Sequence, residues 1–145
     1  MAMVVVERII GNIKDIDATS LHKDPIKLYY DELNWTHRRL SSTRGTHVIL
    51  SLPAGTHMRD GDILYKDDAT VIYIDLISEK VVHIYPENNI QWAKVAYKIG
   101  SMQKELFLKN DGIYAIYGTA IVRMLNELNV CYKTEDAKLE DEIDF

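Results

Sequence analysis

The first 85 residues contain short apolar runs, of which some alternate with polar positions and others are rich in β-branched residues, and both patterns are typical of β-strands. Turn-forming strings such as Gly11-Asn12, Pro53-Ala54-Gly55 and Asp60-Gly61-Asp62 separate these runs. No helical periodicity interrupts them, apart from one short turn of helix or an irregular edge at Glu32–Leu40. We therefore predict strands at Val4–Ile10, Ile26–Tyr30, Val48–Leu52, Ile63–Tyr65, Val71–Leu76 and Lys80–Tyr85.

The pattern changes at Pro86, after which apolar positions recur at intervals of three and four. This spacing predicts a helix of about fourteen residues that starts near Glu87 and buries one apolar stripe. Gly100 suits the left-handed cap that ends such a helix. The predicted buried stripe is Ile90, Ala93, Ala96, Tyr97 and Gly100.

A hairpin and a second helix complete the predicted elements. The string Lys109–Gly112 separates two strand-like runs, and its Asp-Gly pair is a strong hairpin signal. Thr119 suits the N-cap of the following helix, and Asn129 suits its C-terminal cap before a short strand, Val130–Tyr132. The apolar stripe of this helix is Ile121, Met124, Leu125 and Leu128.

The order of the predicted elements indicates the fold class. Counted from the strand before Pro86, the order is β-α-β-β-α-β, which is the split pattern of the ferredoxin-like fold. We therefore predict an α+β protein in which a small all-β domain, residues 1–85, precedes a ferredoxin-like domain, residues 86–145. Since both helices would cover one face of the second sheet, its other face or an edge is open to a partner chain.

Composition and charge narrow the functional classes. With 47% hydrophobic and 27% charged residues among 145, the chain has the composition of a soluble globular protein. The net charge of −5, with only one notable basic cluster at Arg38, Arg39 and Arg44, argues against a nucleic-acid partner. Most of the acidic excess lies in Glu135–Phe145, which we interpret as a solvated acidic C-terminal tail.

Cysteine use and hydropathy indicate the compartment. Cys131 is the single cysteine, so a disulfide within the chain and a Cys-based zinc site are both excluded, and a reducing compartment fits. Glu7 and Arg8 interrupt the apolar start of the chain before a signal-peptide core could form, and no later apolar run is long enough to span a membrane. We therefore expect a cytoplasmic protein.

Four local strings resemble the UreE family of urease accessory proteins, and the match of order and spacing runs nearly end to end. That family joins an N-terminal β domain to a ferredoxin-like C-terminal domain, which is the plan predicted above. The strings are Glu7–Asn12, similar to the opening strand; Arg39–Thr46, similar to the basic segment followed by Gly-Thr; Gly61–Tyr65, similar to the Gly-Asp-(Ile/Val)-Leu turn; and Tyr97–Gly100, similar to the end of the first C-terminal helix.

The resemblance implies a metallochaperone or scaffold that takes part in nickel delivery to the urease active site during urease maturation. It implies a homodimer, a peptide- or partner-binding N-terminal domain, and the urease apoprotein and the urease accessory GTPase complex as partners. It does not imply an enzyme, and the sequence has no phosphate loop, nucleophile elbow or H-E-x-x-H helix. The alternative is a general protein- or peptide-binding module unrelated to urease, because a fold does not fix a function.

The metal position of the family is altered in this chain. In the family, Asn-Arg-His follows the glycine that ends the helix, and this histidine and its copy across the dimer bind nickel. Here the three positions are Ser101, Met102 and Gln103. A Gln amide offers a carbonyl oxygen, which is a harder and weaker donor for Ni(II) than an imidazole nitrogen. Gln103 is therefore the candidate metal residue, with either weak nickel binding, aided by water and tail carboxylates, or no tight site.

Other metal-ligating residue types have alternative explanations. Met102 offers a soft thioether that favours Cu(I), or a flexible contact at an interface. We expect Cys131 to be a small buried hydrophobe and His83 to be a half-buried strand residue rather than a ligand. Asp60-Gly61-Asp62 has the spacing of a calcium loop without its later Glu. The remaining histidines form no H-x-x-H or H-x-H pair, and we expect exposed imidazoles at His37, His47 and His57.

Overall fold

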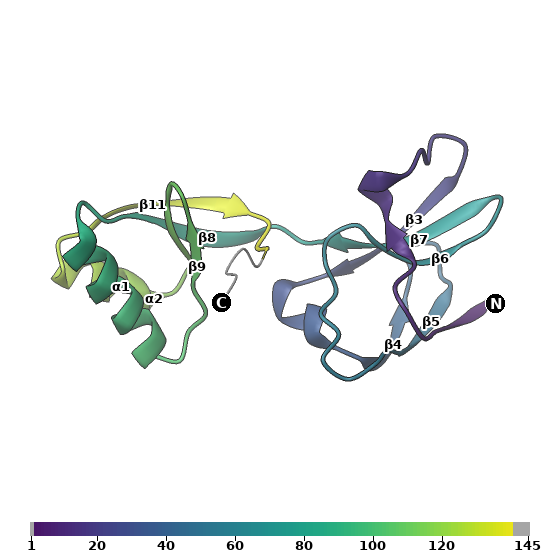
Figure 1. The fold of residues 1–145 in the computed structure, drawn as a ribbon, viewed down its shortest axis with the longest axis horizontal. Coiled ribbons are helices and arrows are strands. Elements are labelled where there is room, and N and C mark those ends of the chain that lie inside the picture. The colour runs from purple at the N-terminus through teal and green to yellow at the C-terminus, as the bar shows by residue number, and fades with distance from the viewer. Residues whose placement is uncertain (1, 141–145) are drawn as a thin grey trace. The chain divides into compact units, whose positions relative to one another are not determined.

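The computed structural model describes residues 2–140. Contacts within the chain divide it into two units, one up to Ile77 and one from Ser78 onward (Figure 1). The sequence pattern places the boundary later, at Tyr85-Pro86. The difference is the strand Glu79–Tyr85 (β8), whose two pairing partners are both strands of the second unit.

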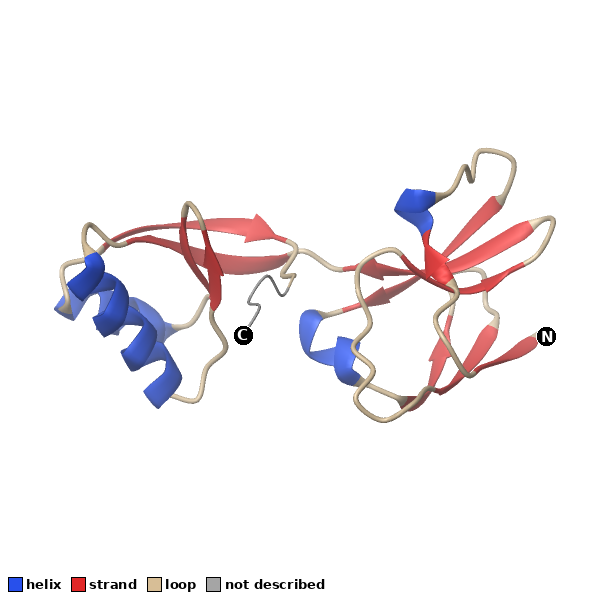
Figure 2. Cartoon of the chain, viewed as in Figure 1, coloured by secondary structure: helices blue, strands red, loops and turns tan. Residues whose placement is uncertain are grey.

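The first unit consists of two sheets, with 3-10 helices in two of the connections between strands (Figure 2). In the three-stranded sheet, of order β1-β5-β4, β5 pairs in parallel with β1 and antiparallel with β4. The four-stranded sheet has the order β2-β6-β7-β3. The strands are β1 (Met3–Val6), β2 (Gly11–Asn12), β3 (His22–Leu28), β4 (His37–Ser41), β5 (His47–Ser51), β6 (Asp62–Lys66) and β7 (Thr70–Leu76), with 3-10 helices at Ile13–Asp15 and Tyr30–Asn34.

The alternation that predicted strands in this unit is confirmed. Ile26, Leu28 and Tyr30 are buried, as are the alternate residues of β5 and Leu52. The predicted first strand is too long, because the chain bends at Glu7-Arg8 and β1 ends at Val6. The irregular region at Glu32–Leu40 contains the end of the second 3-10 helix and most of β4.

Two of the strings that resemble the UreE family meet in this unit. The side-chain amide nitrogen of Asn12 donates hydrogen bonds to the backbone carbonyl oxygen of Asp60, at 2.9 Å, and to the carboxylate of Asp62, at 3.2 Å. Gly61 lies between them with φ at +84°, and a Cβ there would lie 2.7 Å from the Asn12 side-chain oxygen. Glycine is therefore required at this turn both by its backbone conformation and by the close approach of Asn12.

The second unit contains one antiparallel four-stranded sheet and both α-helices. The sheet has the order β11-β8-β10-β9, so β8 and β10 are its central strands. The element order β-α-β-β-α-β agrees with the order predicted from the sequence. After β8, the elements are α1 (Asn89–Ser101), β9 (Phe107–Lys109), β10 (Gly112–Ile116), α2 (Thr119–Glu127) and β11 (Cys131–Ala137).

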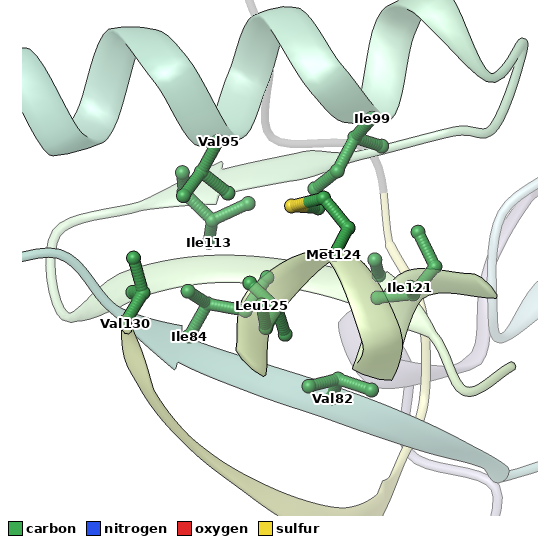
Figure 3. Packing of buried hydrophobic residues seen from close by; sticks show 10 residues of the cluster. Val82, Ile84, Val95, Ile99, Ile113, Ile121, Met124, Leu125 and Val130 are labelled. Carbon is green, nitrogen blue, oxygen red and sulfur yellow. The ribbon is translucent and has the colours of Figure 1, made fainter. Parts of the chain in front are cut away.

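One hydrophobic core joins both helices to one face of this sheet (Figure 3). The predicted stripe of α2 is confirmed, since Ile121, Met124 and Leu125 are buried in this core and Leu128 packs against it. The sheet and the segment before β11 contribute Val82, Ile84, Ile113, Ala115 and Val130.

The predicted stripe of α1 is wrong. Val95 and Ile99 face the core, and Trp92 and Met102 pack against it, whereas Ile90 is 68% exposed and Tyr97 is 74% exposed. Both stripes have helical spacing. The buried one carries the larger set of apolar side chains, whereas the predicted one includes two alanines and a glycine.

The helix starts differ from the predicted starts by one or two residues. The side chain of Asn88 caps α1 by accepting a hydrogen bond from the Gln91 N–H at 2.9 Å, so the helix starts after the predicted Glu87. Gly118 is the N-cap of α2, and Thr119 is the first helical residue. The hairpin predicted at Lys109–Gly112 is confirmed by the pairing of β9 with β10.

The last strand is longer than predicted. β11 runs to Ala137 and pairs with the whole of β8, so Glu135–Ala137 belong to a strand and not to a solvated tail. Residues 141–145 of the predicted acidic tail lie outside the described residues. No helix between residues 2 and 140 has the length and apolar character needed to cross a membrane.

Candidate functional site

The candidate metal residue, Gln103, lies at the turn that ends α1. Its φ of 56° places it in the left-handed region. The Gln103 N–H donates to the carbonyl oxygen of Gly100 at 2.9 Å, and the Lys104 N–H donates to that of Ile99 at 3.2 Å. These two bonds form a Schellman motif, in which the left-handed residue follows the C-cap.

Gly100 is therefore not the left-handed cap that the sequence predicts. It lies inside α1, which continues to Ser101, with Met102 as the C-cap. The physical reason is the packing of Met102 on the core of the second unit, which extends the buried stripe of α1 by one position. The left-handed conformation therefore occurs at a glutamine, where it carries a steric cost that glycine would avoid.

The adjacent side chains of Met102 and Gln103 lie in different environments. Gln103 is exposed, whereas Met102 is half-buried against the core of the second unit, which favours a packing role over a thioether ligand. No group of three His, Cys, Asp or Glu side chains within residues 2–140 could hold a metal ion. No such group of three therefore accompanies Gln103 in this part of the chain.

The electrostatic surroundings of Gln103 are mixed. The negative end of the α1 dipole favours a cation at this position. However, Lys98 lies in the last turn of the helix and Lys104 directly follows Gln103, and both are exposed. These ammonium groups lower the electrostatic attraction for a divalent cation.

An exposed apolar stripe runs along the outer side of α1. Ile90 and Tyr97, the residues wrongly placed in the core, are the most exposed large hydrophobic residues in the described part of the chain. A second stripe of Trp92, Val95, Ile99 and Met102 has the same spacing and larger side chains. This second stripe was the signal in the sequence that could have assigned Ile90 and Tyr97 to the surface.

The histidines of the first unit do not converge. His22 is exposed, and His37 is exposed as expected. His47 and His57 are half-buried, contrary to expectation, because each lies against neighbouring structure: the Nδ1 atom of His47 is enclosed without a hydrogen-bond partner, and His57 contacts the side chain of Asn34. None of these imidazoles belongs to a group of metal-ligating side chains in the described residues.

His83 is more buried than expected, with 4% of its surface exposed. Its Nε2 atom lies 3.0 Å from the carbonyl oxygen of Asp111, and the Tyr85 hydroxyl lies 2.9 Å from its Nδ1 atom. Because a carbonyl oxygen only accepts, Nε2–H donates to it and Nδ1 accepts from Tyr85. The ring also stacks on Tyr114, with centroids 4.1 Å apart. Both nitrogens are thus used in structural hydrogen bonds.

Charged groups surround this imidazole on the sheet face away from the helices. Glu135 Oε1 lies 3.4 Å from His83 Nδ1, and Asp111 Oδ2 lies 3.7 Å from Nε2. Burial, together with the hydrogen bond from its hydroxyl to Asp111, raises the pKa of Tyr114. A hydrogen bond with Tyr85 and then the negative charge of Glu135 raise the pKa of Lys133. The arrangement stabilises a neutral phenol and an ammonium group.

The other candidate residues are an exposed cysteine and two aspartates that hold the backbone. Cys131 is exposed, contrary to the expected buried position, because it begins β11 at the edge of the sheet. Asp60 accepts a hydrogen bond from the Leu76 N–H at 2.8 Å, and Asp62 accepts one from the Arg59 N–H at 2.7 Å. The Asp60 carboxylate therefore holds the last residue of β7, and the Asp62 carboxylate holds a backbone group of its own turn.

Comparison with known proteins gives a consistent result along the chain. Residues 6–76 match the family model described as the N-terminal domain of the UreE urease accessory protein. A urease accessory protein UreE of Helicobacter hepaticus is 30% identical over 132 residues, which cover 88% of this chain and 76% of that protein.

Two further relatives extend the match. The urease accessory protein UreE of Bacillus sp. strain TB-90 is 23% identical over 137 residues, covering 94% of this chain and 93% of that protein. The urease accessory protein UreE of Staphylococcus saprophyticus is 25% identical over 138 residues, covering 94% of this chain and 92% of that protein. The similarity therefore includes both units and nearly the whole length of these relatives.

Proposed function

Because the chain belongs to the UreE family of urease accessory proteins, we propose that it acts in urease maturation as a metallochaperone or scaffold in nickel delivery to the urease active site. The family is one of accessory proteins and not of enzymes. The observation that carries this proposal is the similarity of both units to proteins named urease accessory protein UreE. Its partners would be the urease apoprotein and the urease accessory GTPase complex, in the cytoplasm.

The two parts of the chain take separate roles in this proposal. We propose that the unit ending at Ile77 forms the partner-binding β domain and that the unit from Ser78 onward, which includes β8, forms the ferredoxin-like domain that carries the metal position. The order of elements and the antiparallel sheet order β11-β8-β10-β9 support the ferredoxin-like assignment. The two-sheet architecture of the first unit supports a domain that presents strand edges to a partner.

Gln103 is the proposed contact point for nickel, with weaker binding than the family's histidine would give. It is exposed at the negative end of a helix dipole, and its amide oxygen is a hard and weak donor for Ni(II). One chain offers no further grouped ligands in its described part. A complete nickel site therefore requires further donors, which are a second Gln103 from another copy of the chain, water or tail carboxylates.

A homodimer formed through α1 would supply that second copy. The exposed fractions of Ile90 and Tyr97 support this arrangement, because large apolar side chains in one stripe are typical of an interface. We expect Tyr97→Glu to shift the protein from dimer to monomer in sedimentation equilibrium. Tyr117→Glu is the matched control, since Tyr117 is also exposed but precedes α2. A dimer that withstands Tyr97→Glu rules out this interface.

Urease activation in cells tests the proposed role. Cells that lack this gene should activate urease poorly under limiting nickel, and added nickel should restore activity because mass action replaces assisted delivery. Intact activation under limiting nickel would contradict the role in urease maturation. That result would instead favour the general protein- or peptide-binding module unrelated to urease.

A further inference from the structure

An acid-free and arginine-rich segment forms one edge of the three-stranded sheet in the first unit. From Asn34 to Arg59 the sequence contains no Asp or Glu, although the whole chain has a net charge of −5. β4 lies in this segment and is an edge strand, because β5 is its neighbour on one side only. We call β4 together with Trp35 the basic edge.

The arginines of the basic edge carry charges that the described chain does not neutralise. Arg38 and Arg39 are exposed, and neither forms an ion pair with a carboxylate of residues 2–140. The Arg38 guanidinium lies 3.7 Å from the centroid of the Trp35 ring. This stacking limits the movement of the guanidinium and leaves its N–H donors available to an anion.

The backbone of β4 has free positions along the same edge. The Leu52 N–H donates to the Thr36 carbonyl, and the Ser42 N–H donates to that of Thr46. In an antiparallel pair the bonded positions alternate, so the even-numbered residues of β4 pair with β5. The N–H and C=O groups of His37, Arg39 and Ser41 consequently face away from β5.

The side chains of β4 add a charge pattern to these free backbone groups. Arg38 and Arg39 lie on opposite faces of the sheet, because successive strand residues alternate. A strand added to this edge would bring two neighbouring side chains close to these two arginines, one on each face. Carboxylates at those positions would form charge-assisted hydrogen bonds with the guanidinium groups.

We propose that the basic edge docks an extended, carboxylate-rich segment of a partner protein as an additional β-strand. The proposal rests on the partner-binding role proposed for the first unit, and it names the surface and the chemistry of the partner. Charged side chains on an edge strand can also serve only to prevent pairing between copies. The experiment must therefore separate docking from edge protection.

The test uses the full chain and a fluorescein-labelled peptide of sequence Thr-Val-Glu-Glu-Val-Thr in an anisotropy titration. We expect saturable binding that weakens with salt, and at least about tenfold weaker binding when both glutamates are glutamine. Arg38→Gln/Arg39→Gln should weaken binding by a similar factor. Arg44→Gln/Arg59→Gln is the matched control, because it removes the same charge from this segment outside β4 and should leave affinity within about twofold.

A second variant tests strand addition independently of charge. Ser41→Pro removes an N–H that faces away from β5, so it leaves the pairing of β4 with β5 in place but removes a bond to an added strand. We expect several-fold weaker peptide binding and an unchanged circular dichroism spectrum. Full affinity in Ser41→Pro would overturn docking by strand addition.

Other results would also overturn the proposal. These are no binding of the peptide by the wild-type chain, equal weakening by the two double variants, and tighter binding of a single-stranded oligonucleotide than of the peptide. Self-association of Arg38→Gln/Arg39→Gln without loss of peptide affinity would assign the arginines to edge protection alone. None of these results depends on Gln103 or nickel, so this proposal and the nickel proposal fail separately.

Discussion

At the scale of single residues, the end of α1 places a glycine in the helical conformation and, three residues later, a glutamine in the left-handed conformation. Gly100 is helical and a Cβ there would meet no atom within 4 Å, so Gly100→Ala should raise the free energy of unfolding by about 0.5–1 kcal/mol. Gln103 has φ of 56°, so Gln103→Gly should raise it by about 1 kcal/mol.

Urea unfolding, followed by the far-ultraviolet helical signal, measures both changes, because both α-helices lie in the second unit. Gln103→Ala is the control for side-chain loss, and it should not stabilise the chain because its Cβ keeps the steric cost. A destabilising effect of Gly100→Ala would show that Gly100 is the left-handed cap, as the sequence pattern suggests.

Replacing Gly112 by alanine should destabilise the chain, unlike the same replacement at Gly100. Its φ is +146°, and a Cβ there would lie 2.3 Å from the backbone oxygen of Ile84 and 2.9 Å from His83 Nε2. Because a backbone atom of a central strand cannot move aside cheaply, Gly112→Ala should lower the free energy of unfolding by at least about 2 kcal/mol. The same unfolding experiment measures it, and a loss below about 0.5 kcal/mol would contradict this environment of His83.

Tyr114 should make the stability of the second unit sensitive to alkaline pH. Its pKa is raised by burial and by the hydrogen bond to Asp111 from an ordinary value of 10.0, so the folded state holds the phenolic proton more tightly than the unfolded state. This contribution is complete below pH of about 10 and is lost as pH rises towards the folded pKa.

The comparison of the wild-type chain with Tyr114→Phe isolates this effect. Above pH of about 10, unfolding free energy should fall more steeply with pH in the wild-type chain, since phenylalanine has no proton to lose. At neutral pH the variant should lose only the partly exposed hydrogen bond, about 0.5–1.5 kcal/mol. Parallel alkaline slopes for the two proteins would show that burial of Tyr114 has no such consequence.

At the scale of elements, the two apolar stripes of α1 should contribute unequally to the free energy of unfolding. Ile99 is fully buried in the core of the second unit, so Ile99→Ala should cost about 2–5 kcal/mol. Ile90 is largely exposed, so Ile90→Ala should change stability by no more than about 0.5 kcal/mol at a protein concentration where the chain is monomeric. Equal losses in thermal unfolding would mean that both stripes are buried.

The elements also show which parts of the sequence pattern were informative. Alternation predicted β3 and β5, whose buried residues lie on one face. The turn signal before Ile63 predicted β6, and runs of β-branched residues predicted β7 and β8, of which β8 is buried on both faces. The Asp-Gly signal predicted the β9–β10 hairpin. The buried face of α1 was not predictable from spacing alone, because Trp92 and Val95 continue a second stripe of the same period. Its end was missed because a glycine inside a helix looks like a cap.

At the scale of the whole molecule, the order of elements was predictable and the division of the chain was less so. β8 begins the second unit by pairing with β10 and β11, and such long-range pairing has no signal at Ile77 in the sequence. The candidate metal position was found through the resemblance, since Gln103 itself has no pattern that marks a site. Its left-handed backbone and its exposure, in contrast, depend on the packing of α1.

We propose that this UreE family member contacts nickel at the end of α1, and that binding is weak because an amide stands there in place of an imidazole. Calorimetric titration of Ni(II) into the wild-type chain, Gln103→His and Gln103→Ala tests it most directly. We expect weak binding by the wild-type chain, at least about tenfold tighter binding by Gln103→His, and no measurable site in Gln103→Ala. Submicromolar binding by the wild-type chain that persists in Gln103→Ala would contradict the claim.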